Sequence, residues 1–373
     1  MKESWGDIRR QNKDRIVQYV LEKKYTSRQK IATDLGYSVP TVVQNVKELI
    51  DFGLLCDIGE FESTGGRKAK MLGFRPGFCC AVGVEVTKSD VRFALLDIVG
   101  EIKKFEQVYF PYENTPEYYF TLGEYVQDFI RRADVDSPIA GVGISLPGVV
   151  VQELGILQNS YGLHISNIAL HSFAQNIPYD VCFERDATSA ARGEISGQTK
   201  DIVYLFLGST VAGAIYIHGR FFYGDFQRAG GFGHSIIVPE GKKCFCGKRG
   251  CFAAYCSTAA LLSGPEDTLD DFFVRVRNQD PCSVQVWDEY MDKLAIAVTN
   301  LRMDFDCSIV LGGEIAEFLS EYMQQIRMRM QRYNIFDMDT SYLSLGRYYR
   351  EAASIGAARK IISQYIRKID FSF

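Results

Sequence analysis

The spacing of apolar residues changes near residue 78, and this change constrains the fold more than any other feature of the sequence. Before it, apolar residues recur mainly at the spacing of amphipathic helices. After it, residues 79–86, 90–97 and 100–108 have the length and pattern of strands. We therefore expect a small, mainly helical domain over residues 1–75 and an α/β domain over residues 76–373.

Charge is divided unequally between these two parts. The 373-residue chain has a net charge of −4, but residues 1–75 hold 14 Lys and Arg against 10 Asp and Glu, a net of +4. The remaining residues hold 28 against 36, a net of −8. A basic head on an acidic body favours a head that faces an anion. The start of the chain is polar, and no apolar stretch is long enough to span a bilayer, so we expect a cytoplasmic protein with no membrane partner.

The head has the helix spacing of a helix-turn-helix. Residues 12–22 and 28–35 predict two helices, the second capped at Thr26-Ser27 and ended by Gly36. A third helix follows Ser38 and ends at Phe52-Gly53. This helix is expected to expose side chains suited to base edges and phosphates in a major groove. They are Ser38, Thr41, Gln44, Asn45 and Lys47.

A basic hairpin follows the three helices. Residues 54–59 and 70–74 predict two strands, and between them lies Ser63-Thr-Gly-Gly-Arg-Lys68. The glycines form a tip, and its cations Arg67 and Lys68 suit a minor groove or a phosphate. The head is therefore predicted to be a winged helix-turn-helix domain that binds double-stranded operator DNA. A three-helix protein-interaction domain with an ordinary hairpin is the alternative.

Three of the ten cysteines are clustered in Cys244-Phe-Cys-Gly-Lys-Arg-Gly-Cys251, and His234 lies upstream of them. Three thiolates and one imidazole form the donor set that favours tetrahedral zinc. Four protein ligands leave no position for a water molecule, so the sequence predicts a structural Zn²⁺ held by His234, Cys244, Cys246 and Cys251. Three unligated thiols near a surface turn are the alternative.

The body reads as two related α/β halves with a cleft between them. Residues 139–148 predict a buried strand after a helix at 116–133, and strands recur at 201–207, 212–218 and 308–313. Several motifs in the body resemble those of the ROK family of sugar-responsive repressors and sugar kinases. They are Gly143-Ile-Ser-Leu-Pro-Gly148, Glu184-Arg-Asp-Ala187, Gly233-His234, the cysteine cluster and Ile309-Val-Leu-Gly-Gly313. The resemblance implies a two-lobed, actin-like and hexokinase-like (ribonuclease H-like) fold and a homodimer.

The phosphate-binding loops depart from the pattern of the kinases in this family. Where those kinases have two adjacent glycines, this chain has Thr87 and Lys88, and Gly208-Ser-Thr-Val-Ala-Gly213 has also lost a glycine. Side chains at these positions obstruct the approach of phosphate to backbone amides. We therefore expect no phosphoryl transfer and no enzyme activity, with Asp186 as a vestige of the catalytic base.

The resemblance also implies an effector pocket formed by Asn159, Arg185, Asp186 and His234. Arg185 replaces an asparagine of the family, while Gly231 and Ala253 replace two glutamates. This exchange of carboxylates for a guanidinium favours an acidic or phosphorylated sugar as effector, or no small-molecule effector. A salt bridge of Arg185 within the protein is the alternative.

The leading hypothesis is a transcriptional regulator of carbohydrate metabolism, acting as a repressor, whose kinase-like cleft binds a sugar-type effector. A second hypothesis is an active ATP-dependent sugar kinase with a DNA-binding head. A third is a constitutive DNA-binding or scaffolding protein whose body only dimerises.

Overall fold

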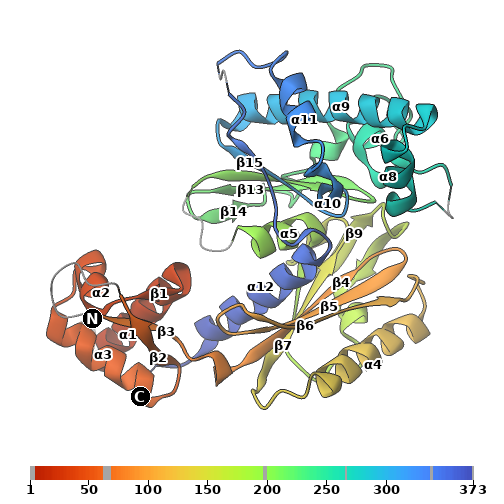
Figure 1. Cartoon of the computed structure of the whole chain (residues 1–373). Coiled ribbons are helices and arrows are strands. Elements are labelled where there is room, and N and C mark those ends of the chain that lie inside the picture. The colour runs from red at the N-terminus through yellow and green to blue at the C-terminus, as the bar shows by residue number, and fades with distance from the viewer. Residues whose placement is uncertain (1–4, 62–68, 196–199, 265–266, 337–338, 372–373) are drawn as a thin grey trace.

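The chain folds into a small head and a larger two-lobed α/β body (Figure 1). The computed structural model describes residues 5–61, 69–195, 200–264, 267–336 and 339–371. None of the described helices is both long and apolar enough to cross a membrane.

The head contains three helices and a small sheet in the strand order β1-β3-β2. Ser27 caps α2 by accepting from the Lys30 amide, and Gly36 ends it with a φ of 69°. The predicted helix-turn-helix is thereby confirmed, although the first helix begins before residue 12. The predicted tip with Arg67 and Lys68 lies outside the described residues. The elements of the head are α1 (Trp5–Lys23), β1 (Tyr25–Thr26), α2 (Arg28–Leu35), α3 (Val39–Asp51), β2 (Leu55–Glu60) and β3 (Lys70–Phe74).

The lower lobe is built on a sheet in the order β11-β7-β4-β5-β6. Strands β4, β5 and β6 form an antiparallel meander, while β7 pairs with β4 in parallel and β11 pairs with β7 in parallel. Helix α4 lies along the outer side of this sheet (Figure 1). The elements are β4 (Cys80–Val86), β5 (Asp90–Asp97), β6 (Ile102–Tyr109), α4 (Pro116–Ala133), β7 (Ile139–Leu146), β8 (Val150–Val151), β9 (Ile156–Ser160), β10 (Ile165–Ala169) and β11 (Val181–Arg185).

The upper lobe repeats this topology, with a sheet in the order β14-β13-β12-β15-β16. Again three strands form a meander and two add in parallel, which confirms the two related halves. Several helices that the sequence analysis did not predict cover this sheet. The elements are α5 (Asp186–Glu194), β12 (Ile202–Leu207), β13 (Val211–Ile217), β14 (Arg220–Phe222), α6 (Ala253–Cys256), α7 (Thr258–Leu261), α8 (Leu269–Arg277), α9 (Pro281–Phe305), β15 (Ser308–Gly312), α10 (Ala316–Leu319), α11 (Met323–Met330) and β16 (Leu343–Leu345). Short 3₁₀ turns lie at Pro76–Phe78, Leu170–Ala174, Phe232–His234 and Tyr349–Glu351.

The last helix, α12 (Ala352–Lys368), runs between the two lobes and toward the head (Figure 1). Glycines allow its backbone to approach its neighbours closely. A Cβ on Gly356 would lie 1.6 Å from the Ser189 carbonyl oxygen of α5, and one on Gly83 would lie 1.7 Å from the Ser354 carbonyl oxygen. Because neither contact leaves room for a methyl group, α12 is held tightly against α5 and the lower sheet.

The head is packed onto the body through a shared apolar core. Ile16 and Leu72 of the head belong to the same buried cluster as Ile355 and Ile362 of α12. Beside this core Lys13 is fully buried, with its Nζ 2.8 Å from Glu48 Oε2 and donating to the Phe371 carbonyl oxygen at 3.2 Å. The segment that follows α12 is thus attached directly to the head.

Candidate functional site

A cavity of about 490 Å³ opens between the two lobes of the body. This volume lies within the range of roughly 300–1,000 Å³ that is typical of small-molecule sites. Asn159, Arg185, Asp186 and His234 all line it, although they come from strand β9, the end of β11, the start of α5 and a 3₁₀ turn. The four residues predicted for an effector are therefore brought together at one cavity.

The two charged residues of this group are held in different ways. Asp186 is buried, and Oδ1 accepts from the Ala187 amide at 2.7 Å. Burial raises the pKa of this carboxyl, with the neighbouring Arg185 opposing the shift. The Arg185 guanidinium donates to the carbonyl oxygens of Ala229 and Gly230 at 2.8 and 3.0 Å, and its direct hydrogen-bond partners are these two backbone oxygens.

Further residues that the sequence analysis did not select also line the cavity. Arg228 is exposed at its wall, 5.7 Å over the Phe226 ring, and forms no ion pair with another described residue. Tyr161 and Phe245 place their rings 5.7 and 5.3 Å from the His234 ring. Phe245 lies inside the cysteine cluster, and Tyr161 lies two residues after Asn159. Their closeness in sequence to these predicted site residues is the feature by which both could have been selected.

A small cavity lies between the degenerate phosphate loops. This cavity of about 90 Å³ is lined by Thr87, Lys88, Gly208 and Ser209, among others. The buried guanidinium of Arg92 also lines it, with Nη1 3.3 Å from Glu85 Oε2 and Nε 3.0 Å from Asp90 Oδ1. A larger cavity of about 530 Å³ borders the same loops through Lys88, Ser209 and Thr210. The obstacle to nucleotide phosphates is therefore the Thr87 and Lys88 side chains and the Arg92 guanidinium, rather than the total volume.

The charges around Arg92 connect the two lobes. Its Nη2 lies 3.8 Å from Glu314 Oε2, and Glu314 Oε1 accepts from the Thr258 hydroxyl at 2.7 Å on the upper lobe. Burial raises the pKa of Glu85 to about 7, against the attraction of Arg92. We refer to Arg92, Glu85, Asp90 and Glu314 as the interlobe ion-pair network.

His234, Cys244, Cys246 and Cys251 form a compact cluster beside the cavity. Their ligand atoms all lie within 4.8 Å of one another. The Cys244 Sγ is 3.9 Å from His234 Nδ1, and the Cys246 Sγ is 3.7 Å from Cys251 Sγ. A Cβ on Gly250 would lie 1.7 Å from the Val238 carbonyl oxygen, so glycine is required for the loop to turn here. The predicted ligand set is thus assembled in a form that can hold a metal ion.

Most of the residues predicted to face DNA lie at the surface of the head. Ser38, Gln44 and Lys47 are exposed, and Thr41 is half-buried. The Ser38 and Thr41 hydroxyls are 2.7 Å apart, and Gln44 Nε2 donates to Glu48 Oε1 at 2.7 Å.

One residue of this group was predicted wrongly. Asn45 is only 3% exposed, and its Nδ2 donates to the Thr41 carbonyl oxygen at 2.8 Å. The amide group therefore satisfies a backbone carbonyl one turn earlier in its own helix and packs inside the head. The expectation that α3 exposes Asn45 was wrong.

Residues 81–363 match the sequence model of the ROK family. The chain belongs to the ROK family. The xylose repressor of Caldicellulosiruptor bescii is 25% identical to this ROK protein over 386 residues, which cover 95% of this chain and 96% of the repressor. The DNA-binding transcriptional dual regulator NagC of Escherichia coli is 23% identical over 268 residues, which cover 69% of this chain and 65% of NagC.

Solved structures show the same fold. A ROK family transcriptional regulator, a homologue of the Escherichia coli MLC protein, superposes with a TM-score of 0.74 at 21% identity, over 96% of each chain. A ROK family glucokinase from Streptomyces griseus superposes with a TM-score of 0.63 at 23% identity, over 98% of its own length but only 75% of this ROK protein. The regulator thus matches nearly the whole chain, whereas the kinase leaves about a quarter of it unmatched.

Glu85 should make stability depend on pH. Its carboxyl pKa is raised from 4.5 to about 7 in the folded protein, so folding favours the protonated form. This contribution is fully present below the unfolded pKa and is lost as the pH rises through the folded pKa. Between about pH 5 and about pH 8, wild-type protein should lose up to about 3 kcal/mol of unfolding free energy relative to Glu85→Gln. Urea denaturation across this range measures the difference. If the unfolding free energies of the two proteins changed with pH in the same way, the raised pKa of Glu85 would be contradicted.

Proposed function

We propose that this ROK protein is a DNA-binding transcriptional regulator of sugar metabolism that acts as a repressor without phosphoryl transfer. The observation that carries this proposal is the combination of a helix-turn-helix head with a kinase-like cleft whose phosphate region is filled by Arg92. Relatives that cover nearly the whole chain are named xylose repressors, which supports the same assignment.

The head is proposed to read operator DNA with α3. Lys47 supplies a cation for phosphates, and Ser38, Thr41 and Gln44 supply groups that pair with base edges or phosphates. In a homodimer, two such heads would contact two half-sites separated by about one helical turn of DNA. We also propose a cytoplasmic location, as expected for such a regulator.

The interlobe cavity is proposed to bind a sugar-type effector. Its volume suits a monosaccharide derivative, and Asp186 and Asn159 supply polar groups for hydroxyls. Arg228 leaves an unpaired cation at the wall, which favours an acidic or phosphorylated sugar. Because closure of the lobes on a ligand acts on α12, which reaches the head, effector binding is expected to change the affinity for DNA.

The cysteine cluster is proposed to hold a structural Zn²⁺ with His234, Cys244, Cys246 and Cys251 as ligands. Zinc accepts this sulfur and nitrogen donor set in tetrahedral geometry, and four protein ligands leave no open position for chemistry. The ion would fix the loop that places His234 and Phe245 at the effector cavity. Its role is therefore to shape the site.

DNA binding tests the main proposal directly. Duplexes selected from a random library by the wild-type protein should bind Lys47→Gln about tenfold more weakly, because a cation that faces the groove is lost. Arg131→Gln, which removes an exposed cation from α4 far from the head, is the matched control and should bind like wild type. Fluorescence anisotropy at fixed salt measures both affinities.

A panel of neutral and phosphorylated sugars is then added to the complex of wild-type protein and DNA. Failure of the wild-type protein to enrich any duplex would refute the proposal, and release by a sugar would identify the effector class.

Metal content tests the zinc proposal. Purified wild-type protein should contain close to one zinc per chain, and Cys246→Ser should lose most of it. Loss of the ion should lower the thermal midpoint by on the order of 10 °C. Cys282→Ser changes an exposed cysteine outside the cluster and should leave both quantities unchanged. Elemental analysis and thermal denaturation give the readouts. A Cys246→Ser protein with full zinc content would contradict the assignment.

A further inference from the structure

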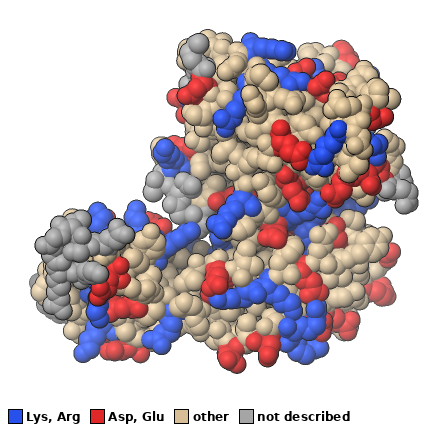
Figure 2. All heavy atoms as spheres, viewed as in Figure 1, with Lys and Arg blue, Asp and Glu red and all other residues tan. Residues whose placement is uncertain are grey.

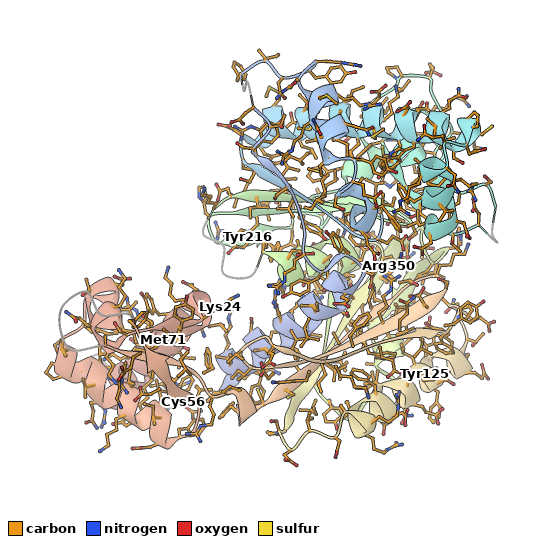
Figure 3. All side chains as sticks on the ribbon, in the orientation of Figure 1. Lys24, Cys56, Met71, Tyr125, Tyr216 and Arg350 are labelled. Carbon is orange, nitrogen blue, oxygen red and sulfur yellow. The ribbon has the colours of Figure 1, made fainter. Side chains whose placement is uncertain are left out.

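A second cavity, separate from the cleft, lies where the head meets the body. Its volume is about 340 Å³. Figure 3 shows Lys24 on the side of the head that faces the body and Tyr216 across the junction on the sheet of the upper lobe. Residues of α12 form the floor between them, including Arg359 and Arg367. We call this space the junction cavity.

The walls of the junction cavity carry more positive than negative charge. Figure 2 shows Lys and Arg side chains in the recess between head and body. Its cationic residues are Lys24, Arg192, Arg359 and Arg367, and the acidic residue among the described wall residues is Glu22. Of these cations, Arg192 is neutralised by two hydrogen bonds to Glu184 at 2.9 and 2.8 Å. The charge of the other three is what requires explanation.

These three cations have no carboxylate partner among the described residues. Arg359 donates to the carbonyl oxygens of Arg192 and Gly193. The side chains of Lys24 and Arg367 form no hydrogen bond or ion pair within the described part of the chain. Arg359 is half-buried, whereas Lys24 and Arg367 are exposed at the cavity, so the three side chains form a concave group of cations that is open to an anion from solvent.

The cations of the junction also repel one another. Burial lowers the pKa of Lys24, and repulsion from Arg359 and from the nearby Arg347 lowers it further. Burial likewise lowers the pKa of Arg359. Repulsion from Arg359 and Arg347 thus places Lys24 in a positive potential, whereas Tyr348 and Glu194 partly offset the effect of burial on the pKa of Arg359.

Aromatic rings hold two of the guanidinium groups in place. Arg359 lies 5.7 Å over the Tyr348 ring, and Arg347 lies 5.4 Å over the same ring. Stacking of this kind fixes the orientation of a guanidinium while leaving its outer N–H groups free for an oxyanion. Arg347 does not line the cavity, so the cavity presents one oriented guanidinium, that of Arg359 on α12, opposite Lys24 of the head.

We propose that the junction cavity is a binding site for a small molecule that carries one or more phosphate groups. Arginine and lysine donors match phosphate oxygens in charge and geometry. The enclosed volume holds a diphosphate with a small organic group. The backbone of DNA is another source of phosphate, but α3 lies on the side of the head away from the body (Figure 1), so the predicted DNA surface and the junction cavity face different directions.

A ligand here would contact the head and the body at once. Lys24 belongs to the head, while Arg359 and Arg367 belong to α12. An anion that binds all three fixes the position of the head relative to the body, and the ligand and DNA then influence each other's affinity reciprocally. This regulatory consequence rests on the proposed function as a DNA-binding protein, whereas the site itself does not.

Calorimetry with the full chain and inorganic pyrophosphate tests the site. Wild-type protein is expected to bind pyrophosphate saturably at a single site. The double variant Lys24→Gln/Arg367→Gln removes two exposed cations of the cavity and should bind at least about tenfold more weakly. The control Lys23→Gln/Lys368→Gln removes the same charge at the neighbouring positions, which do not line the cavity, and should bind within about twofold of wild type.

Three other results would contradict the proposed phosphate site. Equal weakening in both double variants would show attraction to overall charge. Weakening by Arg228→Gln would place the anion in the interlobe cavity, and absence of saturable binding would exclude a built site. The calorimetric test needs no DNA, so a negative result does not affect the proposal that the protein regulates transcription. Likewise, a failure to bind DNA would not exclude a phosphate site in the junction cavity.

Discussion

The position of the Arg92 guanidinium between the two lobes is the interaction on which the rest of the structure depends. It is 7% exposed and lies between carboxylates of the lower lobe and Glu314 of the upper lobe. A buried charge of this kind needs partners on every side, so the network favours the observed arrangement of the lobes. We propose that it also obstructs the place where nucleotide phosphates would lie. The adjacent cavity remains open for a ligand, with Asp186 and His234 at its wall.

Helix α12 gives this cleft a physical connection to the head. It packs against α5, which begins with Asp186, at a contact so close that only glycine fits at position 356. Its other end shares an apolar core with the head, and the Phe371 carbonyl oxygen that follows accepts from the buried Lys13. The junction cavity lies along the same helix. A rigid element that contacts the cleft, the junction and the head is suited to transmit a difference between two lobe arrangements.

Local chemistry was predictable from the sequence, and long-range pairing was not. Ser27 and Gly36 bound a helix at the predicted residues because capping depends on a few neighbouring positions. The metal ligands lie close in sequence and were found by spacing. Arg92 was missed because its partner Glu314 is distant in sequence. Helix α12 was missed because residues 352–358 are all buried and show no polar face, although the second half of the helix has one. Asn45 was misassigned because its bond to the Thr41 carbonyl oxygen, which turns it inward, leaves no sequence signal.

The central claim is that the interlobe ion-pair network has replaced the phosphate site of the kinases while the sugar-sized cavity persists. Calorimetric titration of the zinc-loaded protein with ATP and Mg²⁺, with and without sugars, tests this claim most directly. We expect no saturable heat from the nucleotide at millimolar concentration, because Thr87 and Lys88 stand where phosphate needs close approach to the backbone and the Arg92 guanidinium lines the space between the loops. Stoichiometric, saturable binding of ATP–Mg²⁺ would contradict the account.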